Sequence, residues 1–503
     1  MQLSRYRFYS AIFVSLISLI LLLSSCKLPF VPENQEPSVE ESYEGKKQLK
    51  FSALKATNND PYSVQAVLLA ENNDCIVYGD YAAKISLSTA EEIAREYAEH
   101  IAPSITGVFG KYYPSNKKLI ILLLDIIDGY DSKRDTTYVA GYFSVKDIFP
   151  KSRVSNSNEA PMLYIDINPG KPGDSNFYPT IAHELQHLIN FSSRYRSKES
   201  ELENEPDPNT VVASIQQDEW VDEGLSSAAE YIYSNAVGKN KDGNGHIRDK
   251  VDYYNKAKDY YDKGQSRIAW GNNFFTWGEN NNFIYDEYVT VYLFFQWLRI
   301  QANDGTNIYR SIVESEYTDY RAVTAAARNH IPRLFEGIDS SDDQTKELEL
   351  LLETWFAANY VNVPKKEMAD GSGIFGYNDE ITLTPVMLSG ESVPLYPGEG
   401  VYSKLGGEIF LYPPKSPAHI RYAGLNKTEN PLIRITPENS GRGDALLTFN
   451  ANHDTTAIAG KPASEPGTLA GVEAAPEEPS PSGRAADMPA KPFPIDIRPP
   501  LRF

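Results

Sequence analysis

The sequence predicts an α+β fold in which a mixed β-sheet precedes a helical half, with a β-rich extension after it. A continuous apolar run at residues 118–128, bounded by polar residues, is typical of a strand buried on both faces. Apolar side chains then recur at helical intervals in residues 285–300 and 346–360. After Val363, short apolar runs separated by Gly and Pro are typical of strands. Strands followed by helices in separate blocks indicate the α+β class.

The composition is that of a globular protein long enough for about two or three domains. The chain has 503 residues, of which 41% are hydrophobic and 23% are charged. Its formal net charge is −20. Such an acidic chain argues against a nucleic-acid partner and offers no basic patch to an anionic membrane.

The first residues have the pattern of a targeting segment. Arg5 and Arg7 precede an apolar run at residues 11–23, which is short for a membrane span, and Leu-Ser-Ser-Cys ends at Cys26. This resembles a bacterial lipoprotein signal peptide, residues 1–25, with its lipobox. The resemblance implies that Cys26 becomes the lipidated N-terminus, so that the protein is anchored to a membrane of the cell envelope, outside the cytoplasm. A plain secretory signal or an uncleaved anchor is the alternative.

Residues 26–50 are polar, acidic and proline-bearing, which predicts a disordered tether. The folded part is expected to begin near Phe51. Cys75 is the second of two cysteines, so lipidation of Cys26 leaves no intramolecular disulfide. We expect Cys75 to be a small, half-buried strand residue.

Local patterns place the next elements. The spacing Ser88-Thr89-Ala90-Glu91 is that of a capping box and predicts a helix over residues 89–102, ended by Pro103. Residues 137–144 and 161–168 are expected to be strands.

The segment 180–190 carries His-Glu-x-x-His in a helical pattern. Residues four apart lie on one face of a helix, so His183 and His187 can direct both imidazoles at one zinc ion. Glu184 can then take a proton from the water that attacks a carbonyl group. Asp174 or Ser175 is a candidate cap for this helix, and Pro179 falls in its first turn. The alternative is a buried amphipathic helix with two ordinary histidines.

A hydrolytic zinc site needs three protein ligands and one open position. The third candidate lies in the amphipathic segment 219–232, which contains Glu219, Glu223 and Glu230. Its pattern Trp-x-x-Glu-Gly resembles the glutamate helix of gluzincin peptidases, in which the Glu before the Gly binds the metal. This resemblance implies that Glu223 is the ligand, and Glu230 is a candidate for a hydrogen bond to a ligand histidine.

Together the two helices resemble the hyicolysin-type family of secreted bacterial neutral metallopeptidases. The resemblance covers roughly residues 118–360 and implies a zincin-like catalytic domain, taken here as residues 51–363, with one Zn²⁺ per chain and protein or peptide substrates. Glu223 follows His187 by 36 positions, a wider gap than in short-spaced gluzincins. The charged stretch 192–218 is therefore expected to be an inserted loop near the cleft.

Further candidates lie C-terminal to this helix. His246 is a less favoured candidate for a metal ligand or an oxyanion stabiliser. The stretch 252–282 is rich in aromatic residues, which is compatible with the lining of a substrate cleft and equally with an ordinary core. Tyr288 and Tyr292 are candidates for donating a hydrogen bond to an oxyanion, with packed core as the default for both.

The sequence after residue 300 predicts helices, a β-rich segment and a disordered tail. Helices are expected at residues 307–315 and 320–329. Residues 364–450 are expected to form the β-rich extension and residues 451–503, dominated by Pro, Ala, Glu and Gly, a disordered tail.

The leading hypothesis is a lipid-anchored zinc endopeptidase acting outside the cytoplasm. The alternative is a lipid-anchored surface adhesin or ligand-binding protein on the same fold, with little or no proteolysis. The intact Glu184 argues against that alternative, because catalysis is the evident use for an acid at this position. A purely structural zinc is disfavoured because such sites have four protein ligands, usually with Cys, and neither cysteine is near the motif.

Overall fold

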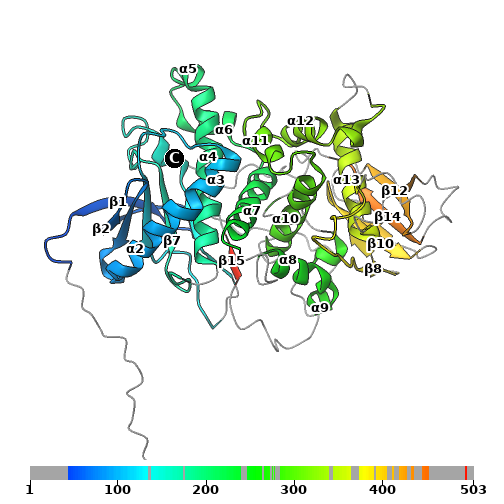
Figure 1. The fold of residues 1–503 in the computed structure, drawn as a ribbon, viewed down its shortest axis with the longest axis horizontal. Coiled ribbons are helices and arrows are strands. Elements are labelled where there is room, and N and C mark those ends of the chain that lie inside the picture. The colour runs from blue at the N-terminus through cyan, green and yellow to red at the C-terminus, as the bar shows by residue number, and fades with distance from the viewer. Residues whose placement is uncertain are drawn as a thin grey trace, which may run out of the picture. The chain divides into compact units, whose positions relative to one another are not determined.

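A six-stranded mixed sheet forms the N-terminal half of the folded chain (Figure 1). The structure is a computed structural model that describes residues 43–133, 137–173, 176–238, 246–262, 266–271, 275, 277, 284–338, 344–363, 373–389, 392–404, 410–412, 419–427, 432–434, 444–452 and 493–495. The lipoprotein signal, Cys26 and residues 27–42 of the predicted tether lie outside these residues. The last residues of that stretch, 48–50, already belong to a strand, so the folded part begins slightly before Phe51. Within the described residues, no helix has both the length and the apolar character that crossing a membrane requires.

The shortest strand of the sheet lies at one of its edges. Its strands are, in spatial order, β1 (Gln48–Leu54), β2 (Pro61–Glu71), β3 (Cys75–Asp80), β4 (Leu119–Leu124), β7 (Met162–Asp166) and β6 (Gly141–Phe143). The central pairs β3/β4 and β4/β7 are parallel, whereas β1/β2, β2/β3 and β6/β7 are antiparallel. The edge strand β6 therefore runs opposite to β7.

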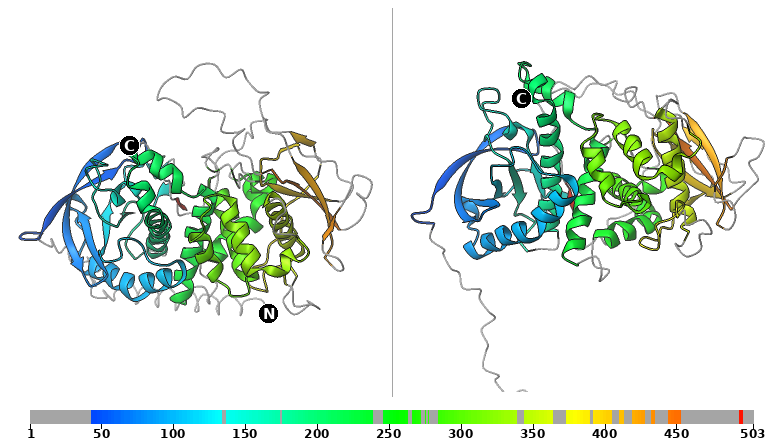
Figure 2. Two further views of the ribbon diagram at one scale, coloured as in Figure 1. Left: turned by 90° about the horizontal axis from the view of Figure 1, so that it is seen from above. Right: turned by 45° about the horizontal axis from the view of Figure 1, so that its top comes forward.

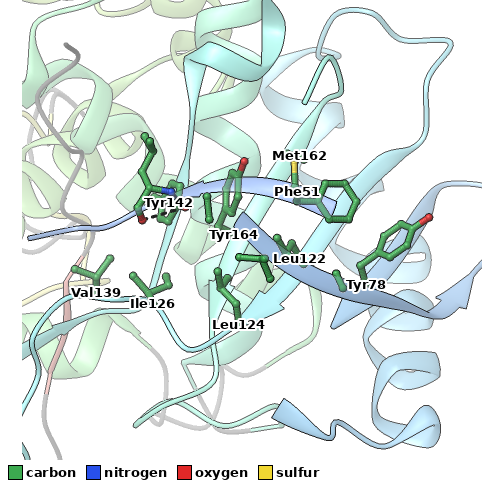
Figure 3. Close-up of a cluster of buried hydrophobic side chains, with 13 residues drawn as sticks. Phe51, Tyr78, Leu122, Leu124, Ile126, Val139, Tyr142, Met162 and Tyr164 are labelled. Atoms are coloured by element: carbon green, nitrogen blue, oxygen red, sulfur yellow. Dashed lines mark hydrogen bonds between the residues drawn. The ribbon is translucent and has the colours of Figure 1, made fainter. Parts of the chain in front are cut away.

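The strands form where alternating apolar residues can be buried on both faces. Phe51, Tyr78, Leu122 and Tyr164, from four different strands, gather in one core cluster (Figure 3). Ile121, at the neighbouring position of β4, is also fully buried, because successive strand residues point to opposite faces. The prediction of a strand buried on both faces is confirmed.

Helix α4 (Phe177–Ser197) packs against β6 and β7 and also against α7 (Glu219–Ala236), so it lies between the sheet and the helical half (Figures 1 and 2). The other helices are α2 (Leu87–Glu96), α3 (Ala102–Phe109), α5 (Glu199–Leu202), α6 (Pro208–Ile215), α8 (His246–Asn255), α9 (Ala257–Asp262), α10 (Ile284–Gln301), α11 (Asn307–Val313), α12 (Tyr320–His330) and α13 (Gln344–Val361). The helices predicted in the second half are thus confirmed, within a few residues.

The predicted end of the first helix is wrong. Pro103 does not end the first helix, because a π-helical turn (Tyr97–Ile101) joins α2 to α3. Pro103 is the second residue of α3 and directly follows this turn, where the N–H of Ala102 bonds to the oxygen of Tyr97, five residues back.

The stretch 192–218 is largely helical rather than a loop. Helix α4 continues to Ser197, and α5 and α6 follow it. Arg194 explains the longer helix, because its guanidinium is buried and donates to the backbone oxygens of Tyr317 and Ile312. Asp207 caps α6, whose first residue is Pro208.

The described residues from Lys46 onward belong to one compact unit, which includes the β-rich segment. This segment contains β8 (Met387–Leu388), β9 (Ser392–Pro394), β10 (Gly400–Lys404), β11 (Phe410–Tyr412), β12 (Ile420–Leu425), β13 (Leu432–Arg434) and β14 (Ala445–Asn450). Five of these strands form one sheet, in the order β13-β12-β14-β10-β8, and it packs against α13. The predicted domain boundaries stay predictions.

One strand comes from the predicted tail. β15 (Phe493–Ile495) pairs in parallel with β5 (Thr137–Val139), which directly precedes β6. The prediction of disorder did not anticipate this pairing. Other residues after Asn452 lie outside the described part of the chain.

Candidate metal centre

Helix α4 holds the His-Glu-x-x-His motif rigidly. Ile181, Leu185 and Leu188 are fully buried and fix the helix in the interior. Pro179 is the third helical residue, in the first turn as predicted. The candidate caps Asp174 and Ser175 lie outside the described residues.

His183 and His187 lie one turn apart and are 3% and 1% exposed. Their ring centroids are 4.8 Å apart, and the ring planes are inclined by 78°. Because both rings are enclosed, their orientation depends on the side chains around them rather than on solvent. Two buried imidazoles at this spacing require partners at their nitrogen atoms.

Glu223 faces both imidazoles from α7. One carboxylate oxygen is 3.3 Å from Nε2 of His183, and the other is 3.6 Å from Nε2 of His187. Of the other two acids proposed for this position, Glu219 is exposed at the start of α7 and Glu230 faces a different nitrogen. The geometry thus favours Glu223 as the third ligand, despite the 36 positions that separate it from His187.

The remaining ring nitrogens face carboxylates. Nδ1 of His183 is 2.8 Å from Oε1 of Glu230, and Nδ1 of His187 is 3.3 Å from Oδ1 of Asp222. An ionised carboxylate can only accept a hydrogen bond, so these contacts favour the tautomer in which each Nδ1 carries the proton. This leaves the Nε2 lone pairs, on the side of Glu223, available to coordinate a metal.

The donor set fits zinc. The three ligand atoms from His183, His187 and Glu223 all lie within 4.8 Å of one another and are buried. Zinc bonds of about 2.0–2.2 Å place tetrahedral ligand atoms roughly 3.3–3.6 Å apart. Each Nε2 lies within this range of one Glu223 oxygen, although the two contacts are to different oxygens of the carboxylate. Two neutral imidazoles and one carboxylate leave a fourth position open, as a hydrolytic zinc site requires.

Glu184 lies on the side of α4 that approaches β6. It is fully buried, and its Cγ lies 3.2 Å from the position that a Cβ on Gly141 would occupy. The same Cβ would be 3.0 Å from Cγ2 of Thr180. Gly141 therefore allows the edge strand to pass close to the proposed catalytic carboxylate.

Gly224 explains the Glu-Gly pair that begins the glutamate helix. A Cβ on Gly224 would lie 2.2 Å from Cε2 of Phe295 on α10, a separation that atoms cannot adopt. The glycine therefore lets α7 pack directly on α10. This contact fixes the depth at which the neighbouring Glu223 enters the site.

Replacing Gly224 with Ala is expected to lower the free energy of unfolding by about 1–3 kcal/mol, because Phe295 must move out of a packed core. Gly107 is a matched control, since it lies in α3 with nothing within 4 Å of its Cβ position. Gly107→Ala should stabilise the protein by roughly 0.5–1 kcal/mol, the usual gain in a helix. Urea unfolding of the metal-free proteins measures both values. Stabilisation by both substitutions would show that Gly224 is not needed for packing.

The two tyrosine candidates occupy different places on α10. The ring of Tyr288 lies 6.4 Å from that of His183 and is tilted by 49°. Tyr292 is fully buried beneath the ammonium group of Lys250. Burial raises the pKa of Tyr292 well above its usual value, with the nearby Glu230 carboxylate adding to the shift. Tyr288 is thus the tyrosine that lies beside a candidate ligand.

The third candidate, His246, is the first residue of α8, and its side chain lies outside the described part of the structure. Asp222, Asn190 and Lys250 also contribute to the site, and sequence reasoning missed them. Asp222 accepts a hydrogen bond from Asn190, and Lys250 pairs with Glu230. The position of Asp222 beside Glu223 was the one usable signal for this group.

No family model matches this chain. Its sequence is similar to that of neutral metalloprotease ShpI from Staphylococcus hyicus, with 24% identity over 288 residues. The similar region covers 55% of this chain and 56% of ShpI, so the chain spans about half the length of this relative. The similarity relates the chain to a metalloprotease, and its α+β fold with a buried His183, His187 and Glu223 group agrees with that relationship.

Proposed function

We propose that this protein is a zinc-dependent endopeptidase that hydrolyses peptide bonds of proteins outside the cytoplasm. The observation that carries the proposal is the convergence of both Nε2 atoms on Glu223, while Glu230 and Asp222 hold the two Nδ1 atoms. This arrangement leaves three donors facing one point. The similarity to a metalloprotease supports the same reading.

Each residue has a distinct part in the proposed reaction. His183, His187 and Glu223 would hold the zinc ion. When bound, the ion supplies polarisation of the scissile carbonyl and makes the attacking water more acidic. Glu184 accepts the proton of that water and then passes it to the nitrogen of the leaving amine.

The edge strand supports an extended peptide as the substrate. β6 ends the six-stranded sheet, and an extended segment can add to such an edge through backbone hydrogen bonds. A peptide aligned in this way would pass the point where Gly141 approaches Glu184. Backbone pairing does not depend on the identity of the side chains, and this supports protein substrates.

The proposed location depends on residues 1–26, which lie outside the described structure. Their lipobox pattern supports processing at Cys26 and anchoring of the protein by acyl chains. Mass spectrometry of the mature N-terminal peptide tests this part. An unmodified N-terminus other than Cys26 would remove the lipid anchor from the proposal but would leave the peptidase intact.

We expect purified protein to contain about one zinc ion per chain and to cleave casein. The chelator ortho-phenanthroline should abolish cleavage, while its non-chelating meta isomer should not, and added zinc should restore activity. Metal analysis of the same samples links the loss of activity to the loss of zinc. Bound zinc without cleavage of any protein substrate would favour the surface-binding alternative instead.

A further inference from the structure

Lys250 on α8 contacts Glu230, the carboxylate that faces Nδ1 of His183. Its Nζ is 2.9 Å from Oε2 of Glu230, and the other oxygen of that carboxylate, Oε1, is 2.8 Å from Nδ1 of His183. We infer that Lys250 is a positioning residue, which holds Glu230 in the orientation that directs Nε2 of His183 at the metal. This inference rests on the proposed function, in which His183 is a zinc ligand.

A carboxylate bound through one oxygen alone keeps rotational freedom. The terminal torsion of a Glu side chain is broad, so a single hydrogen bond to His183 would leave the carboxylate plane of Glu230 free to turn. A charge-assisted bond from an ammonium group to the second oxygen removes that freedom. The pair of bonds through Glu230 thus extends from Lys250 to the imidazole ring.

The surroundings of Lys250 stabilise its positively charged ammonium group. Its side chain is 9% exposed, and a buried ammonium group is costly unless it is paired. Glu230 supplies the counter-charge, and the ring of Tyr292 supplies a second contact, with Nζ 4.9 Å from the ring centroid. A lysine that served only solubility would instead direct its ammonium group to water.

Helix α8 is fixed where this contact requires it. Figure 1 shows α8 beside α7 and α10, and it packs against both. The hydroxyl of Tyr253 on α8 donates to Asp286 of α10 over 2.8 Å. Lys250 therefore approaches Glu230 from a helix that is itself anchored to the helical half.

The two histidines are supported differently. Asp222, which faces His187, accepts from the neutral amide of Asn190 on the same helix as the histidine. Glu230, which faces His183, receives the ammonium group of Lys250 from another helix. Loss of Lys250 should consequently affect the orientation of His183 and not that of His187.

The test compares zinc affinity in a double-mutant cycle, measured by competition with a chromophoric chelator. Lys250→Met is expected to weaken zinc binding by about 10- to 100-fold, the usual effect of removing a group that orients a metal ligand through hydrogen bonds. In a Glu230→Gln background the same substitution should change affinity by less than about twofold, because two residues that act through one contact are not additive. Lys256→Met is the control, since its side chain is 57% exposed, and it should change nothing.

The melting temperatures of the metal-free proteins separate positioning from folding. If Lys250→Met does not fold, Lys250→Gln keeps a polar group in the buried position and the same cycle applies. Unchanged zinc affinity in a folded variant, or an equal loss in both backgrounds, would overturn the inference while the peptidase proposal stands. A wild-type protein that binds no zinc would overturn both.

Discussion

Glu184→Gln should retain the zinc content of the wild type and lose peptide hydrolysis by roughly a hundred- to ten-thousand-fold, the range attributed to general acid–base catalysis. Gln has the size and shape of Glu but cannot accept the proton of the attacking water. The isosteric change matters here because Glu184 is fully buried and β6 lies against it at Gly141. A smaller side chain would leave a cavity and confuse a packing defect with a chemical one.

Three measurements on the same preparation decide the role of Glu184: kcat on a peptide substrate, metal content and melting temperature. A fall in kcat alone identifies the proton acceptor. If the variant keeps more than about a tenth of the wild-type kcat, the loss is below the general-base range and another group acts as the base. A joint fall in zinc content would instead place Glu184 among the groups that hold the metal.

The second large effect is expected for Glu223→Gln, which should weaken the binding of zinc. The carboxylate is the one negative ligand of the proposed set, and the neutral amide replaces it with a weak donor. The loss should therefore exceed the roughly 10- to 100-fold typical of groups behind the ligands. Activity at a fixed zinc concentration should fall with occupancy of the site.

Glu219→Gln is the matched control on the same helix. Glu219 is exposed at the start of α7, four positions before Glu223. The substitution removes the same charge from the same helix, so it corrects for the general electrostatic effect of a lost carboxylate. Weaker zinc binding by Glu219→Gln, with Glu223→Gln unchanged, would show that the third ligand has been wrongly assigned.

Much of the fold could be predicted because its signals are local. The apolar run that forms β4 and the helical periodicities of α10 and α13 each lie within one short window. The first half of the site is local too, because four-residue spacing alone brings His183 and His187 to one face of α4. Glu223 could be singled out through a pattern within one helix.

The prediction of a loop at residues 192–218 failed because the state of these residues depends on distant contacts. The charged stretch after Phe191 has the composition of a loop, but Arg194 reaches carbonyl groups more than a hundred positions away and extends the helix. Lys250 is separated from Glu230 by residues that include the undescribed 239–245, and no periodicity links it to the motif. Only the packing of α8 on α7 and α10 brings it there.

The pairing of β15 with β5 has a practical consequence for recombinant protein. Ile495 lies opposite Val139, two positions before Gly141. A truncation that removes residues 493–495, or a tag placed next to them, would disturb the partner of β5, the strand that leads into β6. Recombinant protein should therefore keep β15 and carry its tag elsewhere in the chain.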